Sequence, residues 1–319
     1  MAADRRPAKR LATTRASFIG RERELAFLGE RLAAAGRGEG GVVFITGEPG
    51  IGKTRLLTEF GARAREAGWL VLSGRAHEAD AVTPFLPFAE AVGEYLAGIP
   101  DEELRARLGD SAAAVALLLP ELRERLPDVS LGPTLNTPDR YRSHLLGQLS
   151  SLLVDAARTC EAAGILLTLD DIHWADSDSL ALFEYLARDL PGAPMLVVSA
   201  YRDTELDPGG ALAGVVERLT RERTLQELNL QRLDEDGVRS LLAILGRPNP
   251  PAALVSAVNA ETQGNPFFVE EVFRSLDHEG RLFDASGNWR ADVTFGDTEL
   301  PRSLRLVIQR RLEHLTAEC

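Results

Sequence analysis

Residues 47–54 read GEPGIGKT and carry the residue types that cradle phosphate groups. Glycine tolerates positive φ and lets backbone N–H groups approach an anion, and a helix that starts here adds the positive end of its dipole. Lys53 is then expected to contact the β- and γ-phosphates as a catalytic cation, and the Thr54 hydroxyl to ligate Mg²⁺. The full match to G-x-x-x-x-G-K-[ST], between an apolar run and a helical pattern, favours this role over a glycine-rich turn with an exposed lysine. The predicted nucleotide contacts are Gly47, Glu48, Pro49, Gly50, Ile51, Gly52, Lys53, Thr54 and Arg55.

A second candidate site lies in ILLTLDDIHWADSDS, residues 165–179. An apolar run delivers two carboxylates to the end of a strand, where Asp170 is expected to hold Mg²⁺ through water and Asp171 to orient or deprotonate an attacking water. The alternative is that one aspartate only caps a turn. His173 fits packing better than metal ligation, because no other histidine or cysteine is near it in the sequence. Residues 176–178 are expected to cap the next helix.

Arg202 follows a third apolar run, in SAYRDTELD, residues 199–207. Its guanidinium is expected to contact the γ-phosphate and report its presence. The alternative is a salt bridge to Asp203 or Glu205. The phosphate loop, the acidic pair and Arg202 each directly follow a predicted strand, and open α/β sheets bind ligands at that edge. This coincidence favours the functional interpretation.

Short apolar runs that do not alternate predict buried parallel strands. They are Val42–Thr46, Trp69–Leu72, Ile165–Leu169 and Met195–Ala200, with a weaker one near Leu225–Leu230. Helix-period segments lie between them, at 54–67, at 85–163 where prolines interrupt the pattern, and at 179–190. This alternation predicts an α/β fold with a parallel sheet and helices on both faces.

Composition excludes several classes of protein. At 319 residues with 45% hydrophobic content, the chain is long enough for about two globular domains on the usual length prior. A net charge of -12 argues against a whole-chain nucleic-acid binder. Cys160 and Cys319 imply no disulfide framework, and no apolar run is long enough to span a membrane, so we expect a cytoplasmic protein.

Further segments strengthen one interpretation: FIGRERE at 18–24, DDIHWAD at 170–176, AYRDTEL at 200–206 and QGNPFF at 263–268. Together with the phosphate loop they resemble the STAND class of P-loop ATPases, related to AAA+ proteins, and especially the AAA-like module of bacterial LuxR-type signalling regulators. The resemblance covers about residues 18–279. It implies that ATP or ADP is the ligand, with Mg²⁺, and that Ile19, Gly20, Arg21 and Pro266 border the adenine.

The resemblance also implies a domain plan in which a P-loop NTPase sheet is followed by a helical lid domain and the start of a winged-helix domain. We expect a disordered basic arm at 1–17, the ATPase α/β domain at 18–231, the lid at 232–279, and a hairpin with an incomplete winged-helix start at 280–319. The helical pattern after Asp234, the hairpin pattern at 281–290 and an apolar stripe at Leu304, Ile308, Leu312 and Leu315 are the local signs of this plan.

These features favour a nucleotide-sensing switch with slow hydrolysis. Hydrolytic AAA+ relatives place a sensing arginine just after a similar glycine of the helical lid domain, and this chain has Asn265-Pro266-Phe267 at that place. No arginine finger is recognisable in the sequence either. The rivals are a fast AAA+ motor or loader acting on DNA, and a binding scaffold with a vestigial site. We expect a nucleotide to be the partner of this chain and an ATP state that is compatible with homo-oligomer formation. We expect no membrane contact and no sequence-specific DNA binding by this chain. The chain itself is expected to be an ATPase core without its C-terminal sensor and output domains.

Overall fold

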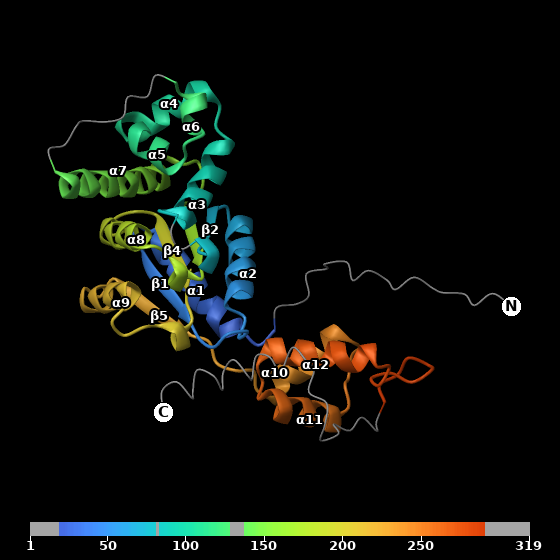
Figure 1. Cartoon of the computed structure of the whole chain (residues 1–319). Coiled ribbons are helices and arrows are strands. Elements are labelled where there is room, and N and C mark those ends of the chain that lie inside the picture. The colour runs from blue at the N-terminus through green and yellow to red at the C-terminus, as the bar shows by residue number, and fades with distance from the viewer. Residues whose placement is uncertain (1–18, 81–82, 128–136, 291–319) are drawn as a thin grey trace. The chain divides into compact units, whose positions relative to one another are not determined.

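The computed structural model describes residues 19–80, 83–127 and 137–290 (Figure 1). The chain divides into two compact units, one of residues Arg23–Gln231 and one of Met1–Glu22 with Arg232–Cys319. The expected basic arm at 1–17, the apolar stripe from Leu304 and the winged-helix start lie outside the described residues. In the described part, no helix combines the length and apolarity that crossing a bilayer requires.

The first unit is built on a parallel sheet whose described strands run in the order β2-β3-β4-β1-β5. The strands are β1 (Gly41–Thr46), β2 (Leu70–Arg75), β3 (Ile165–Asp170), β4 (Met195–Ala200) and β5 (Leu225–Asn229). β3 and β4 are buried at every position, which explains why their sequences are mostly apolar and do not alternate. The predicted parallel sheet with helices on both faces is confirmed (Figure 1). The expected end of the second strand at Leu72 is wrong, because β2 continues through the polar residues Ser73 and Arg75.

Helices connect the strands of this unit. They are α1 (Glu22–Gly36), α2 (Lys53–Glu66), α3 (Leu86–Ala97), α4 (Asp101–Leu108), α5 (Ala112–Leu118), α6 (Leu122–Arg125), α7 (Pro138–Thr159), α8 (Ser177–Asp189) and α9 (Ala211–Arg221). Asp176 caps α8, as predicted, by accepting hydrogen bonds from the backbone N–H groups of Asp178 and Ser179. The stretch between β2 and β3 forms the separate helices α3 to α7, in agreement with the prolines that interrupt its helical pattern.

Helix α3 packs unusually closely against the end of β2. A Cβ atom placed on Gly74 would lie 1.7 Å from the carbonyl oxygen of Pro87, so only glycine fits there. Next to it, the backbone N–H of Arg75 donates to Glu90 Oε2 at 2.8 Å. The last residues of β2 are therefore fixed to the first turns of α3.

The core of the first unit holds the sheet against its helices. Phe44 of β1 stacks on Phe183 of α8 with ring centroids 5.3 Å apart and meets the ring edge of Tyr201 at the same distance. Phe44 and Phe183 are almost fully buried. Burying each such side chain stabilises the fold by about 1.5–3 kcal/mol.

The described residues of the second unit form a small helical bundle of α10 (Glu235–Leu245), α11 (Ala252–Thr262) and α12 (Pro266–His278). Asp234 is the N-cap of α10, where the helical pattern is expected to begin, and its side chain accepts from the N–H of Gly237. After α12 the chain makes a turn in which Phe283 and Trp289 form an antiparallel bridge, at the position predicted for a hairpin.

Candidate functional site

The phosphate-binding loop joins β1 to α2 as the sequence predicts. Gly47, Gly50 and Gly52 have φ values of 141°, 77° and 105°, conformations that other residues adopt only with strain. The loop turns tightly, with the N–H of Ile51 donating to the carbonyl of Glu48 at 3.2 Å. α2 then starts at Lys53, so its N-terminus and the loop N–H groups can face an anion.

Lys53 is a buried cation beside this loop. Its Nζ donates to the carbonyl oxygens of Gly47 at 2.7 Å and Glu48 at 3.0 Å, and within the described part of the chain it forms no ion pair with a carboxylate. Burial lowers the pKa of Lys53, as does the nearby charge of Arg202, because both disfavour the ammonium form. A lysine ammonium has three N–H donors, so one remains for a ligand. A buried cation that, among the described residues, is bonded only to neutral carbonyls suits a phosphate oxygen.

Thr54 and Asp170 lie in contact, as the predicted Mg²⁺ site requires. The Thr54 hydroxyl donates to Asp170 Oδ2 at 2.7 Å, and the N–H of Asp171 donates to Asp170 Oδ1 at 3.0 Å. Burial raises the pKa of Asp170, while the hydrogen bond from Thr54 opposes that rise by stabilising the carboxylate. A hydroxyl and a carboxylate oxygen side by side fit Mg²⁺, which takes few protein oxygens and keeps several waters.

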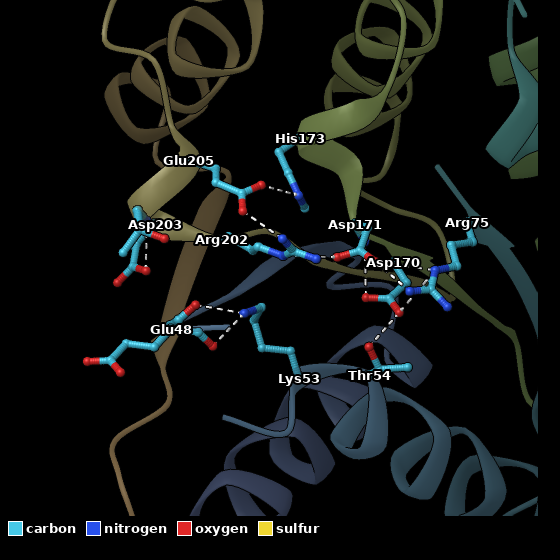
Figure 2. A network of polar contacts seen from close by, with 12 residues as sticks. Glu48, Lys53, Thr54, Arg75, Asp170, Asp171, His173, Arg202, Asp203 and Glu205 are labelled. Carbon is cyan, nitrogen blue, oxygen red and sulfur yellow. Dashed lines mark hydrogen bonds and ion pairs between the residues drawn. The ribbon is translucent and has the colours of Figure 1, made fainter. Parts of the chain in front are cut away.

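Asp171 is held by an arginine that the sequence interpretation missed. Its carboxylate Oδ2 accepts from Arg75 Nη2 at 2.6 Å and from Arg75 Nε at 3.2 Å (Figure 2). The backbone of Asp171 is strained, with φ at 51° for a non-glycine residue. Arg75 ends β2 and pairs in register with Asp170, so the rule that strand ends share one edge could have identified it, had β2 been predicted to its full length.

Arg202 bridges two carboxylates at the same edge. Its Nη1 contacts Glu205 Oε1 at 2.6 Å, and its Nε lies 3.9 Å from Asp171 Oδ1 (Figure 2). The salt bridge to Glu205, weighed as the alternative in the sequence, is thus present, and Arg202 also lies near the acidic pair. His173 Nε2 lies 3.1 Å from the other oxygen of Glu205. His173 is buried beside Trp174, in agreement with the packing role predicted for it.

The residues expected around the adenine belong to the other unit. Gly20 lies beside the side chain of Leu233, and Gly264 fits against the backbone of Leu233, whose carbonyl oxygen would be 2.0 Å from a Cβ at position 264. Pro266 is the first residue of α12 after its N-cap, Asn265. Two of the segments that carry the family resemblance therefore meet at Leu233. The adenine role of Ile19, Gly20, Arg21 and Pro266 stays a prediction, as does the contact of Arg55 with nucleotide.

A family model described as AAA ATPase domain matches residues 17–198. An uncharacterized protein of Rhizobium meliloti (strain 1021) is 27% identical over 269 residues, which are 80% of this chain and 24% of that protein, so the chain spans about a quarter of the length of this relative.

Similar solved structures were also found. One is a Signal Transduction ATPase with Numerous Domains (STAND) protein with a tetratricopeptide repeat sensor from Pyrococcus horikoshii, at a TM-score of 0.47 and 16% identity, covering 92% of this chain and 32% of that one. Another is a RuvB variant of Thermotoga maritima, at 0.44 and 17%, covering 86% and 67%. DnaA of Aquifex aeolicus, bound to AMPPCP, has a TM-score of 0.43 and 15% identity, and the match covers 82% and 62%.

The family match includes the phosphate loop and both aspartates, and it confirms the resemblance seen in the sequence. The sheet supplies the same conclusion independently, because its loop, carboxylates and arginines gather at the carboxyl ends of parallel strands. The chain belongs to the AAA ATPase domain family and is a nucleotide-binding ATPase domain.

Proposed function

We propose that this domain is a nucleotide-sensing switch that binds ATP or ADP with Mg²⁺ and hydrolyses ATP slowly. In this proposal the loop N–H groups and Lys53 bind the phosphates, and Thr54 and Asp170 hold Mg²⁺, which neutralises phosphate charge when bound. Asp171 orients the attacking water, and Arg202 contacts the γ-phosphate.

The proposal of slow turnover rests on the hydrogen bonds that Arg75 donates to the Asp171 carboxylate. The water-orienting carboxylate must accept a hydrogen bond from water in the reactive complex. Here its Oδ2 accepts two N–H groups from Arg75, and Arg202 lies on the side of Oδ1. A carboxylate flanked by two guanidinium groups is oriented and satisfied without water, so the ground state is stabilised against the reactive arrangement.

The support for sensing is the position of Arg202. Its guanidinium is bound to Glu205 on β4's connecting turn, and it lowers the pKa of Lys53, so the two cations share one electrostatic environment. A terminal phosphate between them would be attracted to both, whereas ADP would reach Lys53 alone. The arrangement thus supports the proposal that the residues after β4 adopt different conformations with ATP and with ADP.

The biological setting follows from the resemblance and stays a proposal: a cytoplasmic transcriptional or signalling regulator, with homo-oligomer formation in the ATP state. Moving such a switch from 1:99 to 99:1 requires about 5.5 kcal/mol of differential affinity between its states. The γ-phosphate contacts of Arg202 supply one part of this difference.

The test is to denature the purified protein and identify the nucleotide it releases, and then to compare single-turnover with steady-state ATP hydrolysis. We expect retained ADP and a steady-state rate of ATP hydrolysis well below about 1–100 s⁻¹, which is the range of typical phosphoryl-transfer enzymes such as kinases. Absence of nucleotide together with fast, DNA-stimulated turnover would contradict the switch and support the rival, a motor or loader acting on DNA. The matched control is Lys53→Ala, which must release no nucleotide.

A further inference from the structure

His173 is a buried imidazole whose hydrogen-bonding capacity is unused. Its side chain is only 3% exposed, and among the described residues neither ring nitrogen has a hydrogen bond of acceptable geometry, although Nε2 lies 3.1 Å from Glu205 Oε2. Buried polar groups in folded proteins are nearly always satisfied, because an unmade hydrogen bond there costs free energy. The ring therefore stands beside a partner that it does not yet bind.

That partner is engaged elsewhere. Glu205 Oε1 holds Arg202 Nη1 at 2.6 Å, while Oε2 of the same carboxylate faces the imidazole. The two groups come from neighbouring strands, because His173 lies on the short helical turn Ile172–Trp174 after β3 and Glu205 on the turn Asp203–Glu205 after β4. Figure 2 shows the Glu205 carboxylate joined by dashed lines to His173 and to Arg202, with Arg202 nearest to the phosphate-binding residues.

Binding of a terminal phosphate by Arg202 would break this arrangement. The guanidinium has to leave Glu205 to face the phosphate, and a carboxylate that is 31% exposed would then lose its charged partner. Such a carboxylate either recaptures the arginine or takes another donor. Within the described residues of this edge, His173 Nε2 is the donor group already within 3.1 Å.

We infer that His173 is a positioning residue that takes over Glu205 when Arg202 turns to the γ-phosphate, and thereby sets how strongly the domain prefers ATP over ADP. This inference rests on the proposed role of Arg202. The exchange breaks one hydrogen-bonded ion pair and forms one hydrogen bond from imidazole to carboxylate, with no covalent change. ADP leaves Arg202 on Glu205 and His173 unbonded, so the effect is confined to the triphosphate form.

The surroundings of His173 fit a neutral donor. Burial lowers its pKa most, Arg202 and Lys53 lower it further, and Asp171 and Glu205 oppose them. The neutral ring carries one N–H, which can lie on Nε2 and point at Glu205. The exchange therefore needs no protonation step.

The experiment measures dissociation constants for ADP and for β,γ-methylene-ATP, each with Mg²⁺, by isothermal titration calorimetry. His173→Phe removes the donor and keeps the ring, and we expect it to weaken analogue binding about fivefold while leaving ADP binding unchanged, the equivalent of ~1 kcal/mol for one neutral hydrogen bond. His173→Gln, whose amide can donate, should restore most of the loss. His144→Phe on the exposed surface of α7 is the matched control and should change neither constant.

Glu205→Gln tested alone provides a second measurement that does not depend on the folding of the His173 variants. Removing the charge that holds Arg202 should raise analogue affinity relative to ADP, and His173→Phe should then have no further effect in the double variant. Equal weakening of both nucleotides by His173→Phe, or an undiminished effect in the Glu205→Gln background, would overturn the inference. If Arg202→Gln leaves the ratio of the two constants unchanged, the proposed function of Arg202 is what fails.

Discussion

Replacing Arg75 by glutamine should make the domain a faster ATPase. The substitution removes the guanidinium that donates to Asp171 Oδ2 at 2.6 and 3.2 Å, and keeps a side chain of similar reach. The carboxylate is then free to accept a hydrogen bond from water. Since Arg75 also lies 3.9 Å from Asp170, the loss of its charge should in addition slightly strengthen the binding of Mg²⁺.

The size of the effect follows from the exposure of the pair. A hydrogen bond to a charged group contributes about 1.5–3 kcal/mol, and exposed ion pairs contribute about 0–1 kcal/mol. The Arg75 side chain is 47% exposed and that of Asp171 is 11% exposed, which places their pair between these limits, near 1 kcal/mol after solvent screening. If this stabilisation is absent from the transition state, its loss raises the rate about fivefold, because ~1.4 kcal/mol corresponds to a factor of ten.

The assay is steady-state phosphate release at saturating ATP and Mg²⁺, with binding measured separately so that a change in kcat is not confused with one in affinity. Arg63→Gln is the matched control, because Arg63 pairs with Glu59 on the exposed surface of α2 and the substitution changes the net charge equally. Arg75→Gln combined with Asp171→Asn should show no acceleration. A rate for Arg75→Gln equal to or below that of the unmodified protein refutes the reasoning and would make Arg75 an assisting residue.

Further outcomes test the site and the fold. Lys53→Ala should abolish ATP binding in titration calorimetry, whereas Asp171→Asn should keep binding and lose most hydrolysis, because one group binds ground-state phosphate and the other acts on water. Gly74→Ala should lower the free energy of unfolding by about 3 kcal/mol in urea titrations, since its Cβ would overlap a backbone carbonyl of α3. Gly147→Ala on α7, where a Cβ meets no atom within 4 Å, should instead stabilise by about 0.5–1 kcal/mol. Pro266→Ala should weaken ADP binding without changing its magnesium dependence; unchanged ADP affinity would remove this proline from the base site.

The parts of the fold that sequence predicts well are those set by local chemistry. Buried parallel strands need apolar side chains on both faces, so β1, β3 and β4 are visible as mostly apolar runs that do not alternate. The phosphate loop is equally visible, because its positive φ values at Gly50 and Gly52 demand glycine. The cap at Asp176 follows from the preference of aspartate for exposed helix N-termini.

The parts that sequence does not predict depend on contacts between distant segments. β2 ends in Ser73, Gly74 and Arg75. Their polar or small side chains lack the apolar pattern of a buried strand, so the sequence does not identify Arg75 as the partner of Asp171. The convergence of His173 and Glu205 likewise depends on β3 and β4 being neighbours, which a list of predicted strands does not reveal. Motif spacing identifies which residues react, while strand order decides which residues restrain them.

Because α3 packs tightly on β2, the hydrogen bonds between Arg75 and Asp171 are sensitive to movement of α3. Gly74 lies against the carbonyl of Pro87, and the Arg75 N–H is bound to Glu90. The end of β2 therefore cannot shift relative to α3 without breaking these contacts. A displacement of this helix of only about 0.5 Å would lengthen a 2.6 Å hydrogen bond between Arg75 and Asp171 beyond its normal range of about 2.7–2.9 Å for charged pairs. A force on the helical segment between β2 and β3 would thus be transmitted through Gly74 and Arg75 to the carboxylate of Asp171, the group proposed to orient water.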